Sequence, residues 1–275
     1  MPVMTSVLLA AFLATNSIAF VDSRVHGSNP TNSLCRFVDY EASCRTQNFV
    51  LNTNFWLRGI DFSCVSPWNS GGGRLRAGTA ISKRHIVFGK HYPLWKDVRI
   101  VFVGEDGGVC PCSIVATKDL PNTDIAIGLL NAELTPNIHS AKILPRNAAE
   151  YIGDGTGFPV ITFNQFENAF LTYVRSVRSL ASDFLVVCCG EPTDSCQCRF
   201  RRPIKGGDSG NPAFLLFNGQ PILLFTLYGG GYGTGHCLHA ARSEIQSAMD
   251  ALCSGYRLET FDFSEGRLAQ SLGLR

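Results

Sequence analysis

The sequence is short of charge and has no charged block. Only 17% of its 275 residues are Asp, Glu, Lys or Arg, and the formal net charge is +2. Nothing therefore predicts nucleic acid or an acidic surface as a partner. No apolar run reaches the roughly 20 residues that a membrane-spanning helix needs. These absences leave one or two globular domains with sizeable cores.

The N-terminus has the pattern of an export signal. Val7–Ala14 is a short apolar core and Ser17–Ala19 is a small-residue cleavage pattern, although Met1–Ser6 has no Lys or Arg. We expect residues 1–19 to be a signal peptide and the protein to be secreted or periplasmic. The alternative is an ordinary buried N-terminal segment.

Cysteine is abundant, with eleven residues. That number is typical of disulfides formed in an oxidising compartment, and its oddness leaves at least one thiol unpaired or bonded to another chain. The connectivity stays open. Zinc is the alternative, because two clusters have short ligand spacings. They are Cys188, Cys189, Cys196 and Cys198, and His236, Cys237 and His239. In an exported protein we favour disulfides and expect no metal.

Short apolar runs separated by Gly, Pro and Asn predict many strands. The first five runs are Gly78–Ile81, His85–Phe88, Val98–Val103, Ile114–Ala116 and Ile125–Leu130. The second five are Val160–Phe163, Phe170–Val177, Phe184–Cys188, Ala213–Phe217 and Ile222–Tyr228. Their number and even spacing indicate β-barrels or sandwiches.

One helix is expected near the C-terminus. Ser243 and Gln246 have the spacing of a capping box. One helical face is apolar, with Ile245, Ala248, Met249 and Leu252. We expect this helix to pack on the last sheet.

The segment Gly206–Pro212 has the composition of a nucleophile turn. A serine nucleophile must lie on a tight turn whose backbone N–H groups point at one place, and glycine allows that backbone. Ser209 is the candidate nucleophile, and the N–H groups of Gly207 and Ser209 are the candidate oxyanion hole. The alternative is a Gly-rich turn with a hydrogen bond from Asp208.

Gly207–Pro212 resembles the Gly-Asp-Ser-Gly-Gly-Pro signature of chymotrypsin-like serine proteases, with Asn211 at the second Gly. Two upstream segments resemble the same family: Gly78–His91, a strand, a turn and a second strand leading to a histidine, and Asn122–Ile127. The resemblance implies His91 as the general base and Asp124 as the acid that orients it. It covers about residues 78–252.

One departure from the family, one other histidine and one competing class of hydrolase must be considered beside this resemblance. Tyr92 follows His91 where the family has a cysteine, so the disulfide that braces this loop is absent. His85 lies inside a strand and is expected to be structural. An α/β-hydrolase is excluded, because no Asp or Glu lies between Gly210 and Gly235 to complete a triad after the serine.

The fold implied is all-β, with two antiparallel β-barrels and a C-terminal helix. Residues 20–73 form a Cys-containing extension, 74–150 the first barrel with His91 and Asp124, 151–255 the second barrel with the helix and Ser209, and 256–275 a tail. The function implied is a secreted serine endopeptidase that forms an acyl-enzyme on polypeptide substrates without a cofactor. The alternatives are a catalytically silent binding protein and a serine esterase.

The resemblance also places the specificity pocket. Pro203, six residues before Ser209, lies at its base and carries no charge, which argues against a basic substrate side chain. Ile204 beside it favours an apolar or small side chain. Lys205, His236 and His239 leave an acidic one open.

Two further expectations follow from the same family. Thr226, Leu227 and Tyr228 resemble the edge that pairs with an extended substrate. Asp208 often receives a newly cut N-terminal amine in the family, and Arg24–Gly27 weakly resembles such a cleavage site. We favour an internal cation for Asp208 instead.

Overall fold

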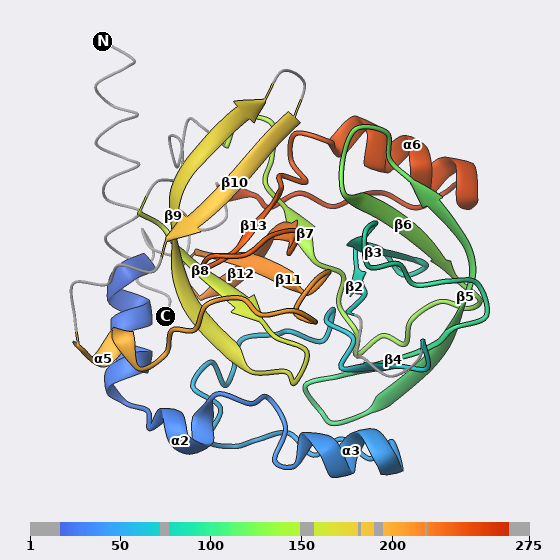
Figure 1. The fold of residues 1–275 in the computed structure, drawn as a ribbon. Helices are drawn as coiled ribbons and strands as arrows, with labels where there is room; N and C mark the ends of the chain where they lie inside the picture. Colours follow the sequence, from blue (N-terminus) through green and yellow to red (C-terminus); the bar gives the residue numbers. More distant parts are fainter. Residues whose placement is uncertain are drawn as a thin grey trace.

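The computed structural model describes residues 17–71, 77–148, 157–180, 183–189, 195–217 and 219–263. It is 32% strand and 17% helix, which confirms the expected β-rich fold. Two sheets lie beside each other, with helices at the periphery (Figure 1). Within the described residues, no helix has the length and apolar character needed to cross a membrane.

The first sheet has six strands in the order β1-β4-β5-β6-β3-β2, all paired antiparallel. They are β1 (Trp68–Asn69), β2 (Thr79–Ala80), β3 (His85–Gly89), β4 (Arg99–Val103), β5 (Val109–Asp119) and β6 (Ile125–Leu130). Every residue of β3 and β6 is buried, in agreement with their continuous apolar sequences. These two neighbouring strands lead into the candidate site.

The second sheet has seven strands in the order β13-β10-β9-β8-β11-β12-β7. They are β7 (Lys142–Ile143), β8 (Pro159–Phe163), β9 (Ala169–Leu180), β10 (Asp183–Cys189), β11 (Pro212–Phe217), β12 (Gln220–Thr226) and β13 (Thr234–His236). Strand β7 pairs with β12 in parallel. Residues 142–143, expected in the first barrel, therefore pair with the second sheet.

All ten predicted runs lie in strands, within a few residues at each end. The sequence did not indicate β1, β7 and β13, because two or three residues are too few to show an alternating pattern.

The C-terminal helix α6 (Arg242–Leu252) corrects two expectations. It packs against β5 and β6 of the first sheet rather than on the last one (Figure 1). It begins before Ser243, with Ala241 at the N-cap and no side-chain cap. The Gln246 side chain instead bonds to Asp250 and to the backbone at Tyr256 and Leu258. The apolar face is confirmed, since Ile245, Ala248 and Met249 are buried.

Residues 20–71, most of the expected N-terminal extension, pack into the fold. They hold α2 (Pro30–Ser33), α3 (Tyr40–Thr46) and β1, and they bury Trp56 and Phe62 in the main core. A bridge between Cys35 and Asn168 joins them to the second sheet. Residues 17–26 are helical, while most of the expected signal peptide lies outside the described residues.

The start of the expected C-terminal tail is also packed. Phe261 and Phe263 are buried in an apolar cluster with Phe217, and Thr260 bridges to Ile143 of β7. Residues 260–263 therefore pack with the second sheet, and residues 264–275 lie outside the described residues.

Candidate active site

His91 and Asp124 lie together because β3 and β6 are neighbours. Gly89 at the end of β3 pairs with Ile125 at the start of β6, so the residues just beyond meet at one edge. Asn122, with φ of 57°, turns the chain between β5 and β6 and leads directly into Asp124. Residues with positive φ are uncommon outside glycine, and Asn tolerates them best.

Both oxygens of Asp124 bond to His91. Oδ1 accepts the backbone N–H of His91 at 2.7 Å, and Oδ2 lies 2.7 Å from Nδ1 of its ring. Asp124 is 7% exposed and the His91 side chain 34%. Because a carboxylate only accepts, Nδ1 carries the proton, and Nε2 is left with a lone pair. That is the tautomer that a general base requires.

The Ser209 turn packs directly against this pair. Gly207 and Gly210 have φ of +100° and +79°, a left-handed region that favours glycine. Gly210 lies so close to Gly89 that a Cβ on Gly89 would meet its Cα at 3.1 Å and Asp124 Oδ2 at 3.4 Å. Ser209 is half-buried. Within the described residues its hydroxyl makes no hydrogen bond with His91.

Some of the backbone N–H groups around Ser209 donate hydrogen bonds within the chain, and two do not. The N–H groups of Asp208, Gly210 and Asn211 donate to Lys205, Leu227 and Asp208 respectively. Across the part of the chain that the structure describes, the N–H groups of Gly207 and Ser209 have no acceptor. These are the two donors that the sequence predicted for an oxyanion hole.

Asp208 is fully buried and has a cation from its own chain. Arg202 Nη2 pairs with Asp208 Oδ2, and the Lys205 N–H donates to the same oxygen at 2.8 Å. The expected internal cation is thereby confirmed, although the sequence did not show which residue supplies it. The alternative cleavage segment 24–27 lies at the end of the first helix, where Val25 is 2% exposed.

A small cavity of about 160 Å³ opens beside Ser209. Its lining consists of Ile204, Lys205, Gly206, Ser209, Leu227, Tyr228, Gly229 and Gly230. Two residues expected at the substrate site, Pro203 and Thr226, do not line this cavity. Pro203 is exposed, and Thr226 is 2% exposed and pairs with Pro212 across β11 and β12.

The expected substrate edge is largely occupied by the chain itself. The Leu227 N–H donates to Asn211, and the Tyr228 N–H donates to Thr234 at 2.8 Å. The Tyr228 N–H is therefore used by a short hairpin to β13, and the Leu227 N–H by the chain just before β11. The exposed Tyr228 ring instead lies 5.5 Å from the His91 ring, edge to face. Sequence reasoning missed this aromatic contact.

His85 is structural, as expected. It is fully buried in β3, and its Nδ1 lies 2.9 Å from the Ser82 hydroxyl. Burial lowers its pKa, which keeps the ring neutral.

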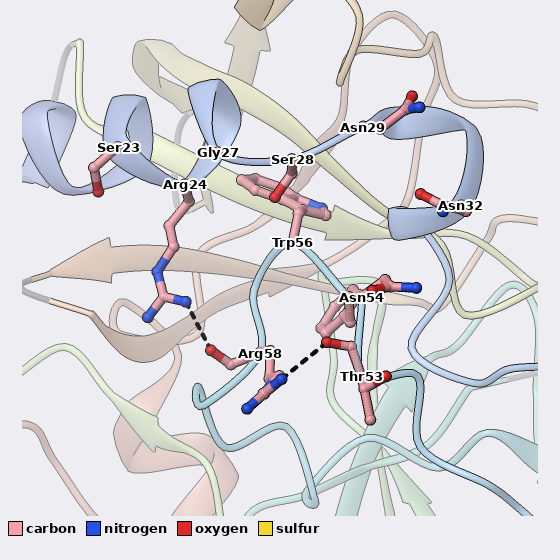
Figure 2. Close-up of a pocket in the computed structure, with 11 residues that line it drawn as sticks. Ser23, Arg24, Gly27, Ser28, Asn29, Asn32, Thr53, Asn54, Trp56 and Arg58 are labelled. Atoms are coloured by element: carbon pink, nitrogen blue, oxygen red, sulfur yellow. Dashed lines mark hydrogen bonds between the residues drawn. The ribbon is translucent and has the colours of Figure 1, made fainter.

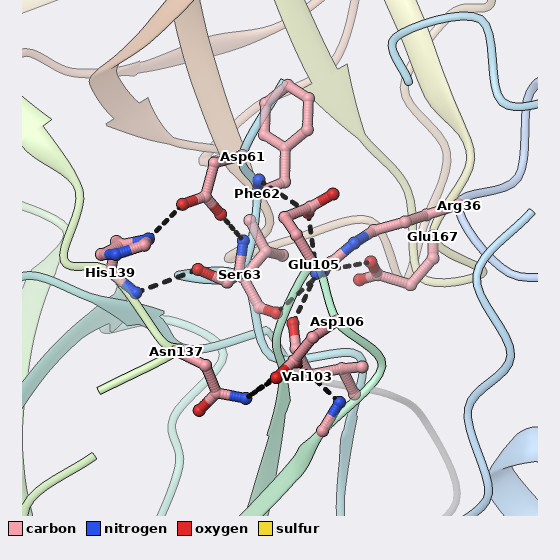
Figure 3. Close-up of polar contacts among 12 residues, drawn as sticks. Arg36, Asp61, Phe62, Ser63, Val103, Glu105, Asp106, Asn137, His139 and Glu167 are labelled. Carbon is pink, nitrogen blue, oxygen red and sulfur yellow. Dashed lines mark hydrogen bonds and ion pairs between the residues drawn. The ribbon is translucent and has the colours of Figure 1, made fainter. Parts of the chain in front are cut away.

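A second acid–histidine pair lies elsewhere in the fold (Figure 3). Asp61 bonds to Nδ1 of His139, and the Ser63 hydroxyl accepts the His139 backbone N–H at 3.0 Å. Ser63 is completely buried. Its hydroxyl cannot reach a substrate, so this constellation lacks a usable nucleophile. Burial opposes ionisation of Asp61, but hydrogen bonds from Ser63 and His139 leave its pKa lowered.

A larger cavity among the described residues is remote from this chemistry. It measures about 750 Å³ and is lined by the first helix, α2 and the loop Thr53–Arg58 (Figure 2). Arg24 donates to the Arg58 carbonyl, and Arg58 donates to the Thr53 carbonyl. Its lining has no histidine and no acidic residue, so size alone does not identify the functional site.

No two cysteine sulfur atoms of the residues that the structure describes lie at disulfide bonding distance. Among described residues, no group of three His, Cys, Asp or Glu side chains could hold a metal ion. The side chains of Cys188 and Cys189 lie outside the described part. His239 bonds to the Leu144 carbonyl, whereas the His236 ring packs on Tyr228.

No family model matches the sequence, and a search among curated proteins finds no match. The resemblance to chymotrypsin-like proteases therefore depends on the three motifs and on the geometry described above.

Proposed function

We propose that the protein is a serine endopeptidase of the chymotrypsin-like kind, with each sheet curled into a barrel. The observation that carries the proposal is the packing of the Ser209 turn against the His91–Asp124 pair. Three segments far apart in the sequence supply a hydroxyl, an imidazole with its Nδ1 bound to a carboxylate, and two unused N–H donors. This is the set of groups that acyl transfer requires.

In the proposed mechanism, Ser209 Oγ attacks the substrate carbonyl while His91 Nε2 takes its proton. The N–H groups of Gly207 and Ser209 stabilise the oxyanion, and Asp124 stabilises the imidazolium. His91 then protonates the leaving amine, and an acyl-enzyme remains on Ser209. Water deprotonated by His91 releases the acid. Active-site hydrogen bonds often tighten only when substrate binds, which accommodates the absent Ser209–His91 bond.

The substrate pocket and the location belong to the same proposal. The cavity beside Ser209 has the size of one small or medium side chain, and Ile204 and Leu227 contribute apolar walls. We propose a polypeptide substrate, secretion or a periplasmic location, and disulfides formed there. The mass of the protein from its natural source would test export, with a start near Phe20 and a loss of about two mass units per disulfide.

A fluorophosphonate probe with mapping of the modified residue tests the mechanism. We expect Ser209 to be labelled and Ser209→Ala to lose labelling and turnover by about 10⁴–10⁶-fold. Ser63→Ala is the matched control, because Ser63 lies beside the other Asp–His pair, and it should keep both. Unchanged turnover in pure Ser209→Ala would refute the proposal. Ester cleavage without peptide cleavage would indicate an esterase, and an unreactive wild type a silent binding protein.

A further inference from the structure

The loop Lys205–Asn211, which holds Ser209, is contacted by the turn between β8 and β9. The Gln165 N–H donates to Asp208 Oδ1 at 3.3 Å. The Gln165 amide also lies 2.8 Å from the place where a Cβ on Gly207 would stand. The position of this turn therefore constrains Gly207, one of the two predicted oxyanion donors, and Asp208, which lies between them.

The turn, residues 164–168, is held in an uncommon conformation. Asn164 Oδ1 accepts the N–H groups of Phe166 and Asn168 at 2.9 and 3.0 Å. Glu167 has φ of 56°, in the left-handed region that a non-glycine residue seldom adopts. Such a conformation persists only when the surrounding structure holds it.

The N-terminal segment supplies that restraint. The Arg36 N–H donates to the Glu167 carbonyl at 3.0 Å, and the Ala169 N–H donates to the Leu34 carbonyl at 2.9 Å. Arg36 Nη1 lies 3.7 Å from Glu167 Oε2, with the two side chains only 2% and 3% exposed (Figure 3). Backbone pairing and a buried ion pair thus act on the same residue.

Arg36 also reaches the first sheet. Its Nη2 donates to the Val103 carbonyl at 2.7 Å, at the end of β4, and its Nη1 lies 3.4 Å from the Val65 carbonyl. Glu105 lies 3.7 Å from Nη2 but is 42% exposed. One guanidinium therefore connects the N-terminal segment and both sheets to the turn at Glu167.

We propose that Glu167 is a positioning residue, whose pairing with Arg36 holds the turn 164–168 against the loop Lys205–Asn211. This assigns a role to the N-terminal segment: it supports the Ser209 loop. The effect on catalysis rests on the proposed function, whereas the mechanical link does not.

The pairing depends on pH. Burial raises the pKa of Glu167 to about 7, against the attraction of Arg36, so the ion pair forms as pH rises through neutrality. The other ionisable groups that act on this site stay neutral there, because burial raises their pKa values. They are Cys35, Tyr40, Cys44 and Cys64. Glu105, across Arg36, also has a raised pKa from burial.

Amide hydrogen exchange tests the link directly. At pH 8 we compare Glu167→Gln with Glu105→Gln, the matched control, which alters the other partner of Arg36 without touching the turn. Exchange in peptides covering residues 205–211 should rise about tenfold in Glu167→Gln and stay unchanged in Glu105→Gln. In peptide hydrolysis, Glu167→Gln should lower kcat with little change in KM.

Gln165→Ala is the second variant, for use if Glu167→Gln does not fold. It keeps the ion pair but removes the amide packed on Gly207, and it should also raise exchange in residues 205–211. Equal exchange in Glu167→Gln and Glu105→Gln, or no change in Gln165→Ala, would overturn the proposal. A wild type without turnover or Ser209 labelling would refute the proposed function alone, since the exchange experiment still decides the link.

Discussion

Asp124 uses its two oxygens for two different tasks. One holds the backbone of His91 and the other holds its ring, so the position and the tautomer of the histidine are set by one carboxylate. The same arrangement does not make a second site at Asp61. There the neighbouring serine is buried and already accepts a backbone hydrogen bond.

Replacement of three histidines separates these roles. His91→Ala should lose nearly all turnover and slow phosphonate labelling of Ser209, because the general base is gone. His139→Ala, the matched control from the second Asp–His pair, should keep activity within about tenfold, or 1.4 kcal/mol of barrier. His85→Ala should mainly lower stability. Activity is measured per folded molecule, and an active His91→Ala beside a dead, folded His85→Ala would reverse the assignment.

The residues of the site differ in how well the sequence indicated them. His91, Asp124 and Ser209 carry recognisable motifs, and the structure brings their segments together. Arg202 was not predicted as the partner of Asp208, because an ion pair between residues so close in sequence depends on a local loop conformation. Pro203 and Thr226 do not line the cavity beside Ser209, because positions taken from a resemblance do not show which way a side chain faces.

At the scale of elements, the turn around Ser209 depends on a glycine. Gly207 has φ of +100°, and a Cβ there would stand 2.8 Å from the Gln165 amide. Gly207→Ala should therefore displace the oxyanion donors and lower kcat by about 10²-fold or more, the usual cost of losing one such donor. Gly206→Ala is the control, because a Cβ on Gly206 meets nothing within 4 Å.

Steady-state hydrolysis with both glycine variants checks this expectation, with circular dichroism as the test of folding. Similar kcat values for the two variants would mean that the N–H of Gly207 is not an oxyanion donor.

Most strands could be predicted because a continuous apolar run of about five or six residues is typical of a buried strand. The ends of β5 and the whole of β13 were not, since neither end of β5 is a continuous apolar run and β13 has only three residues. The position of α6 also could not be predicted from the sequence. Its apolar face shows that it packs on something, but only tertiary structure decides between the two sheets.

At the scale of the molecule, Arg36 connects three regions that the sequence analysis treated separately: the N-terminal segment, the first sheet and the turn at Glu167 in the second sheet. Removing one partner of a buried ion pair leaves the other charge uncompensated, which typically costs about 3–5 kcal/mol. We expect Arg36→Ala to lower the free energy of unfolding by about that amount. Arg45→Ala, on the exposed side of α3, should change it by no more than about 0.5 kcal/mol. Chemical denaturation measures both, and equal small changes would contradict the prediction.

The raised pKa of Glu167 also predicts how stability depends on pH. An unfolded glutamate loses its proton near pH 4.5, whereas folded Glu167 keeps it to about pH 7. Between these values the native state binds more protons, so this residue's contribution to stability is complete below pH 4.5 and is lost as pH rises through 7.

Glu167→Gln removes that contribution. The difference in unfolding free energy, variant minus wild type, should therefore rise between pH 5 and pH 8. Denaturation curves at several pH values measure it, and subtraction cancels the opposite effect of His85, whose lowered pKa makes stability fall in acid. A difference that does not vary with pH would show that Glu167 titrates normally.

The pairing of Arg202 with Asp208 has a consequence for timing. A protease whose oxyanion loop is ordered only by a newly cut N-terminus can be kept as an inactive precursor and activated by proteolysis. Here the positive charge arrives with folding itself, since both residues belong to one short loop. If the proposed function holds, such a protein is active from the moment it folds. Proteolysis of the producing cell's own proteins must then be prevented by folding in another compartment or by a separate inhibitor.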